Sequence, residues 1–456
     1  MAALNAYEQL LLELMNRARL DPVGEAARLG VSLNSGLAAG TISTAPKPPL
    51  APNSAIVTAA RAHSQHMINT DQFDHAGIGD GTPTSRMQGA GYALTGSWRT
   101  GENIGWTGTT GTVNAIAFTT EIADNLFLSA GHRVNTLNPA FREAGTGVVT
   151  GTFKSGGTNY KSVMATENFA LSGSKIFLSG VAINDKDRDN FYDVGEARAN
   201  VSVSITTAGV LDGTVVTQAA GGFGRAVAAG THVVTFSGGG LADSVTATVY
   251  GGSINTKVDL SGSNEILSSV STVLGDGAKD LVLLGAVKAN GSGNDLANVM
   301  IGSKGVNQLA GGNGNDTLYG NAGNDTLIGG AGRDILTGGA GADRFDFNAI
   351  SDTGPTTLAR DIIRDFTHHN TLALSDRIDL ATIDANAALA NDQAFSWKGT
   401  AAFSGVSGQL RYFQENLAGT ASDKTIVEGD INGDKVADFQ IQLAGLKTLA
   451  AADFIL

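Results

Sequence analysis

Glycine recurs at a nine-residue interval in the second half of the chain, and this repeat constrains the fold more than any other feature. The clear copies read GGNGNDTLY, GNAGNDTLI, GGAGRDILT and GGAGADRFD and begin at Gly311, Gly320, Gly329 and Gly338. Weaker copies begin at Gly293 and Gly302. Because a flexible glycine linker does not keep such a register, the repeat predicts stacked structural units.

Each clear copy carries an aspartate at its sixth position, namely Asp316, Asp325, Asp334 and Asp343. A glycine turn followed by a short strand predicts a parallel β-roll in which two copies complete one coil. We therefore expect Asp316 to face Asp334 on one edge and Asp325 to face Asp343 on the other. Sites built only from carboxylate and carbonyl oxygens favour calcium. The predicted ligands are Gly311, Asn313, Asp316, Gly320, Asp325, Gly329, Asp334, Gly338 and Asp343.

Composition limits the partners of the chain. Glycine supplies 61 of 456 residues, and 30 basic residues against 43 acidic ones give a net charge of −13. This charge disfavours non-specific binding to nucleic acid or anionic lipid and favours cations. The absence of cysteine excludes disulfides, thiol catalysis and Cys-ligated zinc.

A second calcium signal is the segment DKDRDNFYDVGE, which starts at residue 185 between two runs that read as strands. Its spacing matches positions 1, 3, 5, 7, 9 and 12 of an EF-hand-type loop. The predicted ligands are Asp185, Asp187, Asp189, the Phe191 carbonyl, Asp193 and Glu196. A solvated acidic turn is the alternative. For the third acidic segment, with Asp430, Asn432, Asp434 and Asp438, a hairpin turn at Asn432-Gly433 is favoured over a calcium site.

The chain as a whole reads as a multidomain α+β protein. We expect an α-β-α sandwich over 1–172, an antiparallel β-sandwich over 175–262, a join with degenerate repeats over 263–292, a β-roll over 293–346 and a C-terminal domain over 347–456. The N-terminus forms an amphipathic helix with Tyr7, Leu10, Leu11, Leu14 and Ala18 at helical spacing. It is not a signal peptide, and no apolar run is long enough to span a membrane.

Several stretches resemble known families. LELMNRARLDP, ARAHSQHMINTDQFDH, SRMQGAGY, GENIGW, LFLSAGHRVNTLNPAFREAGTGV and VMATENFA, over about 4–170, resemble the bacterial, disulfide-free form of the CAP (SCP-like) superfamily. The nonapeptides resemble RTX repeats of bacterial type I-secreted proteins. The segment from 175 to 262 resembles the calcium-bound B-type repeats of bacterial adhesins, a prealbumin-like sandwich. DIIRDFTHHNTLALSDRIDLATID, EGDINGDKVADFQIQLAG and the final DFIL resemble the serralysin-type secretion domain.

The CAP resemblance implies a cleft with two histidines and, in many members, two glutamates. By motif His75 and His132 take the histidine positions and Glu102 the first glutamate position. Ser129 stands near the place of the second glutamate, and Glu121 is a candidate for it by chemistry only. Such a cleft can hold zinc or another divalent metal, bound by His75 and His132 with Glu102 bound directly or through water, or can shuttle protons around a water. A buried hydrogen-bond network is the alternative.

The remaining candidates receive structural assignments. His63, His66, His368 and His369 are interpreted as structural or surface groups, and Arg133 as a residue that holds a helix end or a carboxylate.

The predicted function is a secreted, extracellular calcium-binding protein of a Gram-negative bacterium, which the type I secretion machinery exports without a cleaved signal and external calcium folds. Its cleft would bind an unknown lipid, peptide or surface ligand. An adhesive matrix protein is the second hypothesis, and a metal-dependent hydrolase at the cleft is the third. No established catalytic motif decides whether the chain is an enzyme.

Overall fold

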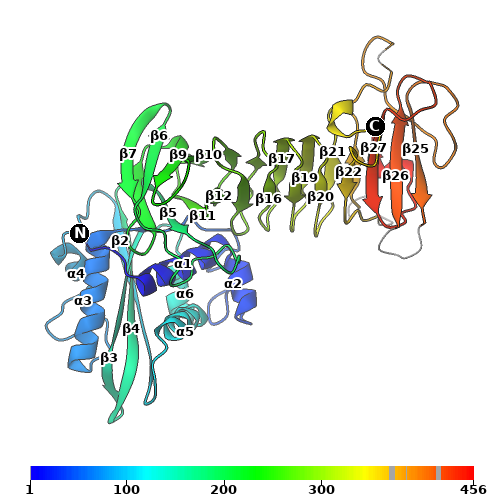
Figure 1. The fold of residues 1–456 in the computed structure, drawn as a ribbon. Helices are drawn as coiled ribbons and strands as arrows, with labels where there is room; N and C mark the ends of the chain where they lie inside the picture. The colour runs from blue at the N-terminus through cyan, green and yellow to red at the C-terminus, as the bar shows by residue number, and fades with distance from the viewer. Residues whose placement is uncertain (1, 369–374, 387, 417–422) are drawn as a thin grey trace. The chain divides into compact units, whose positions relative to one another are not determined.

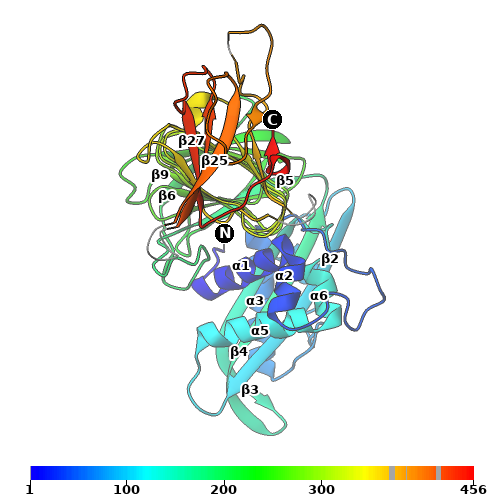
Figure 2. The same cartoon turned by 90° about the vertical axis from the view of Figure 1, so that its right-hand side faces the viewer.

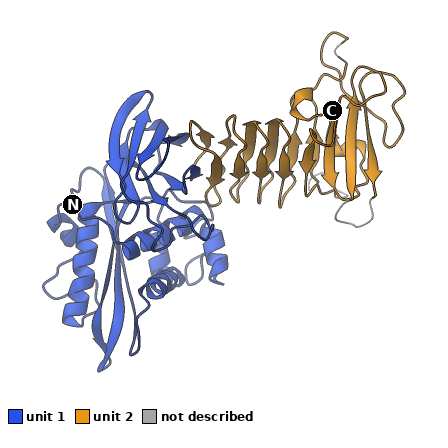
Figure 3. Cartoon of the chain, viewed as in Figure 1, with its two compact units in different colours: residues 1–269 blue, residues 270–456 orange. Residues whose placement is uncertain are grey.

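The computed structural model of the chain describes residues 2–368, 375–386, 388–416 and 423–456 (Figure 1). These residues divide into two compact units, 1–269 and 270–456 (Figure 3). No helix among the described residues is long and apolar enough to cross a membrane. His369, which the sequence assigned to the surface, lies outside the described residues.

The first unit begins with a four-stranded sheet that has helices on both faces. Its elements are α1 (Ala6–Leu20), α2 (Pro22–Arg28), β1 (Ala51–Pro52), α3 (Ser54–Thr70), α4 (Pro83–Gly89), β2 (Trp98–Thr109), α5 (Ala115–Leu128), α6 (Ala130–Thr136), β3 (Glu143–Ser155) and β4 (Thr158–Ser172). The strand order is β1-β3-β4-β2. Helix α3 packs on one face and helices α1 and α5 on the other, which is the predicted α-β-α sandwich (Figure 1).

Local sequence explains where these helices begin and how closely one of them packs. The Asn5 side chain accepts the Glu8 backbone N–H, and the Glu8 carboxylate accepts the Asn5 N–H, which is a capping box at the start of α1. Helix α3 lies so close to β3 that a Cβ atom at Gly145 would come within 2.2 Å of the Val57 backbone nitrogen. Only glycine allows this approach of helix to sheet.

A β-sandwich follows within the same unit. Its strands are β5 (Ile176–Ile183), β6 (Val201–Thr207), β7 (Val210–Val216), β8 (Gly222–Val227), β9 (Gly230–Gly238), β10 (Val245–Gly252), β11 (Thr256–Ser261) and β12 (Glu265–Ser268). One sheet has the order β10-β9-β6-β7 and the other β12-β11-β5-β8. Neighbouring strands are antiparallel as predicted, except that β5 and β11 pair in parallel.

The second unit is a two-sided stack of short strands that runs into longer C-terminal strands. Its elements are β13 (Thr272–Leu274), β14 (Asp280–Leu283), β15 (Gly291–Ser292), β16 (Val299–Ile301), β17 (Gln308–Asn313), β18 (Thr317–Tyr319), β19 (Thr326–Ala331), β20 (Ile335–Thr337), β21 (Arg344–Asp346), η1 (Ile350–Asp352), β22 (Asp361–Ile363), β23 (Arg377–Asp379), β24 (Ser396–Trp397), β25 (Gln409–Glu415), β26 (Lys424–Asp430), β27 (Phe439–Ala444), η4 (Ala451–Asp453) and β28 (Phe454–Ile455). Odd-numbered strands from β13 to β23 form one side and even-numbered strands from β14 to β22 the other.

The stack is the predicted parallel β-roll. Leu309 pairs in register with Leu327, and Leu318 pairs with Leu336, so each coil takes two nonapeptides. All four leucines are fully buried between the two sides. Viewed along its axis, the coils superpose (Figure 2). Apolar contact inside and hydrogen-bonded ladders between coils therefore hold the roll together.

Candidate functional site: a histidine and glutamate cleft and two kinds of acidic site

The cluster of residues that the sequence assigned to a cleft centres on Glu102 of strand β2. Its carboxylate is bound from two sides, by His75 Nδ1 at 3.0 Å from Oε1 and by an Arg86 guanidinium nitrogen at 2.5 Å from Oε2. The Glu102 side chain is only 2% exposed, whereas that of His75 is 48% exposed. The cluster therefore connects a buried carboxylate to the surface through one imidazole.

The two predicted histidines have opposite electrostatic environments. The hydrogen bond to Glu102 raises the pKa of His75 above its ordinary value. Burial, and then the positive charge of His75, lowers the pKa of His132, whose Nδ1 is buried without a partner. The two pKa shifts have opposite signs, so the environment of His75 favours the charged imidazole and that of His132 favours the neutral one. A neutral imidazole can bind a metal or accept a proton.

A third histidine, His63 of α3, which the sequence assigned as a structural or surface group, is buried and belongs to the same cluster. His63 is fully buried, its Nδ1 lies 2.5 Å from Asp80 Oδ2, and its Nε2 lies 3.8 Å from Glu102 Oε1. Burial lowers the pKa of His63. The helical spacing of HSQHM gave no sign of this contact, because Asp80 and Glu102 reach His63 only in the folded chain.

The remaining residues that the sequence placed in or near the cleft lie at different positions in the structure. Glu121 lies exposed on α5, where its carboxylate accepts a hydrogen bond from Thr107 Oγ1 at 3.0 Å. Ser129 is the residue before helix α6. The prediction that Arg133 holds a helix end is confirmed, because its guanidinium donates to the Phe127 and Leu128 carbonyls at the end of α5.

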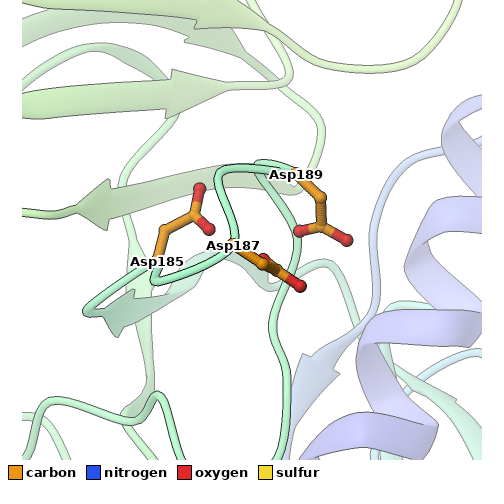
Figure 4. A group of neighbouring side chains, drawn as sticks. All are labelled: Asp185, Asp187 and Asp189. Carbon is orange, nitrogen blue, oxygen red and sulfur yellow. The ribbon is translucent and has the colours of Figure 1, made fainter.

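The predicted calcium loop connects β5 to β6 and gathers its carboxylates. Ligand atoms of Asp185, Asp187 and Asp189 lie within 4.8 Å of one another (Figure 4). Ligand atoms of Asp187, Asp193 and Glu196 also lie within 4.8 Å of one another. Among the described residues, these are the groups of three or more His, Asp or Glu close enough to share an ion. Neither includes a cleft histidine.

The backbone of this loop is shaped around its first aspartate. Asp185 accepts the backbone N–H groups of Arg188 at 2.8 Å and Asn190 at 3.0 Å. Asn190 takes φ of 60°, the left-handed conformation that position 6 requires. Glu196 is buried, and its Oε2 has no hydrogen-bond partner. An oxygen left in this state lacks compensation for its lost hydration, and a cation would supply it.

The nonapeptide aspartates form two columns, one along each edge of the roll. The Asp316 backbone N–H donates to Asp334 Oδ1 at 2.7 Å, and the Asp325 N–H donates to Asp343 Oδ1 at 2.8 Å, so the predicted pairing is confirmed. The Oδ2 atom of each of these four aspartates is buried without a partner. Burial raises the pKa of Asp325 and Asp334 to about 7.

Both columns continue beyond the clear repeats. Asp361 Oδ1 accepts the Asp334 N–H across 27 residues, and Asp376 Oδ1 accepts the Asp343 N–H across 33 residues. Asn298 and Asn307 precede Asp316 and Asp325 in the same pattern. The sequence missed Asp361 and Asp376, since insertions between the coils break the nine-residue register. Alignment of DIIRD with the β-roll strands would have been the available signal.

Strands β26 and β27 are antiparallel, but the eight residues 431–438 form a longer loop between them and not the tight hairpin turn expected at Asn432-Gly433. Asp430 accepts the Gly433 N–H at 2.6 Å and the Lys435 N–H at 3.0 Å, and Asp438 accepts the Ile431 N–H at 2.8 Å. These bonds account for the carboxylates within the loop itself.

Comparison with protein families identifies two of the regions described above. The model of the cysteine-rich secretory protein family, CAP, matches residues 12–168, and that of the RTX calcium-binding nonapeptide repeat matches residues 292–327 and 319–353. No curated protein matches the chain.

Solved structures give partial matches. The AlgE6R3 subunit of the mannuronan C5-epimerase from Azotobacter vinelandii is 32% identical over 36% of this chain and 80% of its own, with a TM-score of 0.25. An extracellular SCP-domain protein from Bacillus anthracis is 20% identical over 37% of this chain and 44% of its own, with a TM-score of 0.24.

Proposed function

We propose that this chain, which carries a CAP domain and RTX calcium-binding repeats, is a secreted protein that folds on extracellular calcium and binds a ligand in its CAP cleft. The observation that carries the proposal is the pair of aspartate columns, in which each nonapeptide aspartate keeps one buried oxygen without a partner. Calcium is the cation that such an oxygen site prefers. Its binding would offset the cost of burying the carboxylates.

Calcium availability then decides where the roll is stable. For a site with Kd of about 10⁻⁴ M, millimolar calcium stabilises the folded state by about 1.4 kcal/mol, whereas submicromolar calcium contributes almost nothing. The stabilisation from several such sites in two columns adds up. The chain would therefore be unfolded in the cytosol and folded outside the cell. The absence of cysteine and the net charge of −13 suit export of an unfolded chain.

Export is assigned to a type I machinery that reads the C-terminal region over 347–456. The support is the serralysin-like sequence DIIRDF and the final DFIL, together with the RTX repeats that precede them. We further assign a single calcium to the loop from Asp185 to Glu196, on the strength of its gathered carboxylates and the unpartnered Glu196 oxygen.

The cleft is assigned a binding role. His75 and His132 would present their imidazoles to a ligand or a divalent metal, with Glu102 bound to His75 at 3.0 Å. Hydrolysis would need a metal-bound or His-activated water, and His75, Glu102 and His132 are not among the described residues that bring three ligand atoms within 4.8 Å of one another. Ligand binding is therefore preferred over catalysis.

The proposal is tested by measuring the full chain in chelator and in calcium. Circular dichroism and calcium counting by equilibrium dialysis should show cooperative gain of β-structure with several ions per chain. Coexpression with a type I exporter should move the chain to the medium, and deletion of residues 451–456 should retain it in the cell. A chain that is fully folded in chelator contradicts the folding switch.

A further inference from the structure

The acidic loop between β5 and β6 also contributes to a hydrophobic core that contains residues of helix α1. Leu10 and Leu14 of α1 form one buried cluster with Val181, Ile183 and Tyr192. The loop residues Phe191 and Val194 pack against this cluster. Helix α1 lies largely within the region matched by the CAP family, whereas the loop belongs to the β-sandwich. The two domains therefore share a core at this point.

The loop contacts α1 through residues that lie between its carboxylates in the sequence. Tyr192 is 1% exposed and immediately precedes Asp193. Its hydroxyl donates to the Ala6 carbonyl, at the start of α1, at 3.4 Å. The Arg17 guanidinium carbon lies 5.1 Å from the centre of the Phe191 ring. Because Tyr192 and Asp193 are adjacent in the chain, a backbone conformation that fixes the position of Asp193 also fixes the position of Tyr192.

The same loop also gathers negative charge. Asp187, Asp193 and Glu196 bring ligand atoms within 4.8 Å of one another, and the buried Glu196 Oε2 has no partner. Without a cation, mutual repulsion of these carboxylates opposes the loop conformation that inserts Tyr192 beside α1. With a cation bound, the same conformation is favoured.

We propose that a calcium ion bound by the loop from Asp185 to Glu196 clasps helix α1 and so makes the stability of the CAP domain calcium-dependent. The inference rests on the calcium site assigned above and adds a regulatory consequence to it. Helix α1 passes the effect to the cleft side of the domain, because the buried Glu8 carboxylate of α1 forms an ion pair with Arg61 of α3, the helix that also carries His63.

The clasp predicts a reciprocal effect on calcium affinity. Two events that stabilise one another must do so equally in both directions. Truncation of Leu14 to alanine removes part of the shared cluster, so it should weaken calcium binding at the loop although Leu14 is not one of the predicted ligands. Met164→Ala removes a buried apolar side chain from a core cluster that contains no α1 residue and serves as the control.

Hydrogen exchange of the full chain tests the clasp directly. We expect backbone amides of residues 6–20 to exchange at least tenfold more slowly in millimolar calcium than in chelator. Glu196→Gln should abolish this slowing while the RTX repeats keep their own calcium response. Asp187→Asn removes an exposed carboxylate of the loop, and should act in the same direction without disturbing a buried group. Asp243→Asn, an exposed acidic residue elsewhere in the sandwich, should change nothing.

The outcomes separate this inference from the calcium site itself. Slower exchange in both the loop and α1, lost in Glu196→Gln, supports the clasp. Slower exchange in the loop alone would leave the calcium site standing and overturn the clasp. Slowing of α1 that persists in Glu196→Gln overturns it too, because calcium would then act elsewhere. No slowing in either segment overturns both the clasp and the loop site.

Discussion

Asp316 donates its backbone N–H to the Oδ1 atom of Asp334, 18 residues further along the chain, at 2.7 Å. One oxygen of Asp334 thus links successive coils, while the other is buried without a partner. The two oxygens of this carboxylate thus differ, since one is a structural acceptor and the other is free for the calcium ligation proposed above. This difference allows the proposed ligating oxygen to be tested by itself.

Asp334→Asn keeps the carbonyl oxygen that accepts the Asp316 N–H and removes the charge. We expect the variant to need several-fold more calcium for half-maximal folding, since losing one site of Kd about 10⁻⁴ M removes about 1.4 kcal/mol in millimolar calcium. Circular dichroism of the full chain during calcium titration measures this midpoint. Asp392→Asn, an exposed residue of the same unit, should leave the midpoint unchanged. Equal midpoints for all three proteins would exclude Asp334 as a ligand.

The cleft is expected to bind zinc weakly through His75 and His132. Calorimetric titration of the full chain in saturating calcium should show a zinc signal that the double variant His75→Ala, His132→Ala loses. Glu121→Gln should keep the signal, because Glu121 is exposed and bound to Thr107. An unchanged signal in the double variant would move any zinc site elsewhere.

Lys257 is expected to be essential for the first unit because it neutralises two buried carboxylates. Its ammonium lies 2.9 Å from Glu13 of α1 and 2.5 Å from Asp259 of β11, and all three side chains are at most 7% exposed. Lys257→Met should cost about 3–5 kcal/mol, since the carboxylates would be left buried and unpaired. Thermal unfolding in calcium measures the loss, and Lys161→Met is the exposed control. Adding Glu13→Gln and Asp259→Asn to Lys257→Met should recover part of it.

Glu167 is expected to make the CAP domain less stable as pH rises. Burial raises the pKa of this carboxyl from 4.5 to about 7, although Asn103 donates a hydrogen bond to it. Between these two values the folded state holds a proton that the unfolded state has released, so the folded state loses stability as pH rises through this window. The loss by pH 8 is on the order of 3 kcal/mol.

Glu167→Gln keeps an acceptor for Asn103 and removes the titration. Denaturant unfolding in saturating calcium at pH 5 and pH 8 should show a smaller decrease for this variant than for the unsubstituted chain. Glu121→Gln provides an exposed substitution of the same type. Parallel pH curves for Glu167→Gln and the unsubstituted chain would show that Glu167 does not titrate in this range.

The sequence alone determined the parts of this protein that repeat or that lie close together along the chain. A nine-residue period can be satisfied only by coils of matching length, so Asp316 and Asp334 had to meet. The spacing from Asp185 to Glu196 likewise gathered its carboxylates into two groups that share Asp187, because a short loop leaves little freedom. These are local constraints, and they need no knowledge of the remaining fold.

Tertiary structure alone decided the contacts between distant segments. Helix α1 has an apolar stripe in its sequence, yet Glu8 and Glu13 on its polar side are buried as well, because the CAP sheet covers one side and the sandwich another. His63 meets Asp80 and Glu102 for the same reason. Asp361 joins its column across an insertion that breaks the period. Such contacts depend on where whole helices and strands pack. The spacing of the two partners along the sequence does not predict that packing.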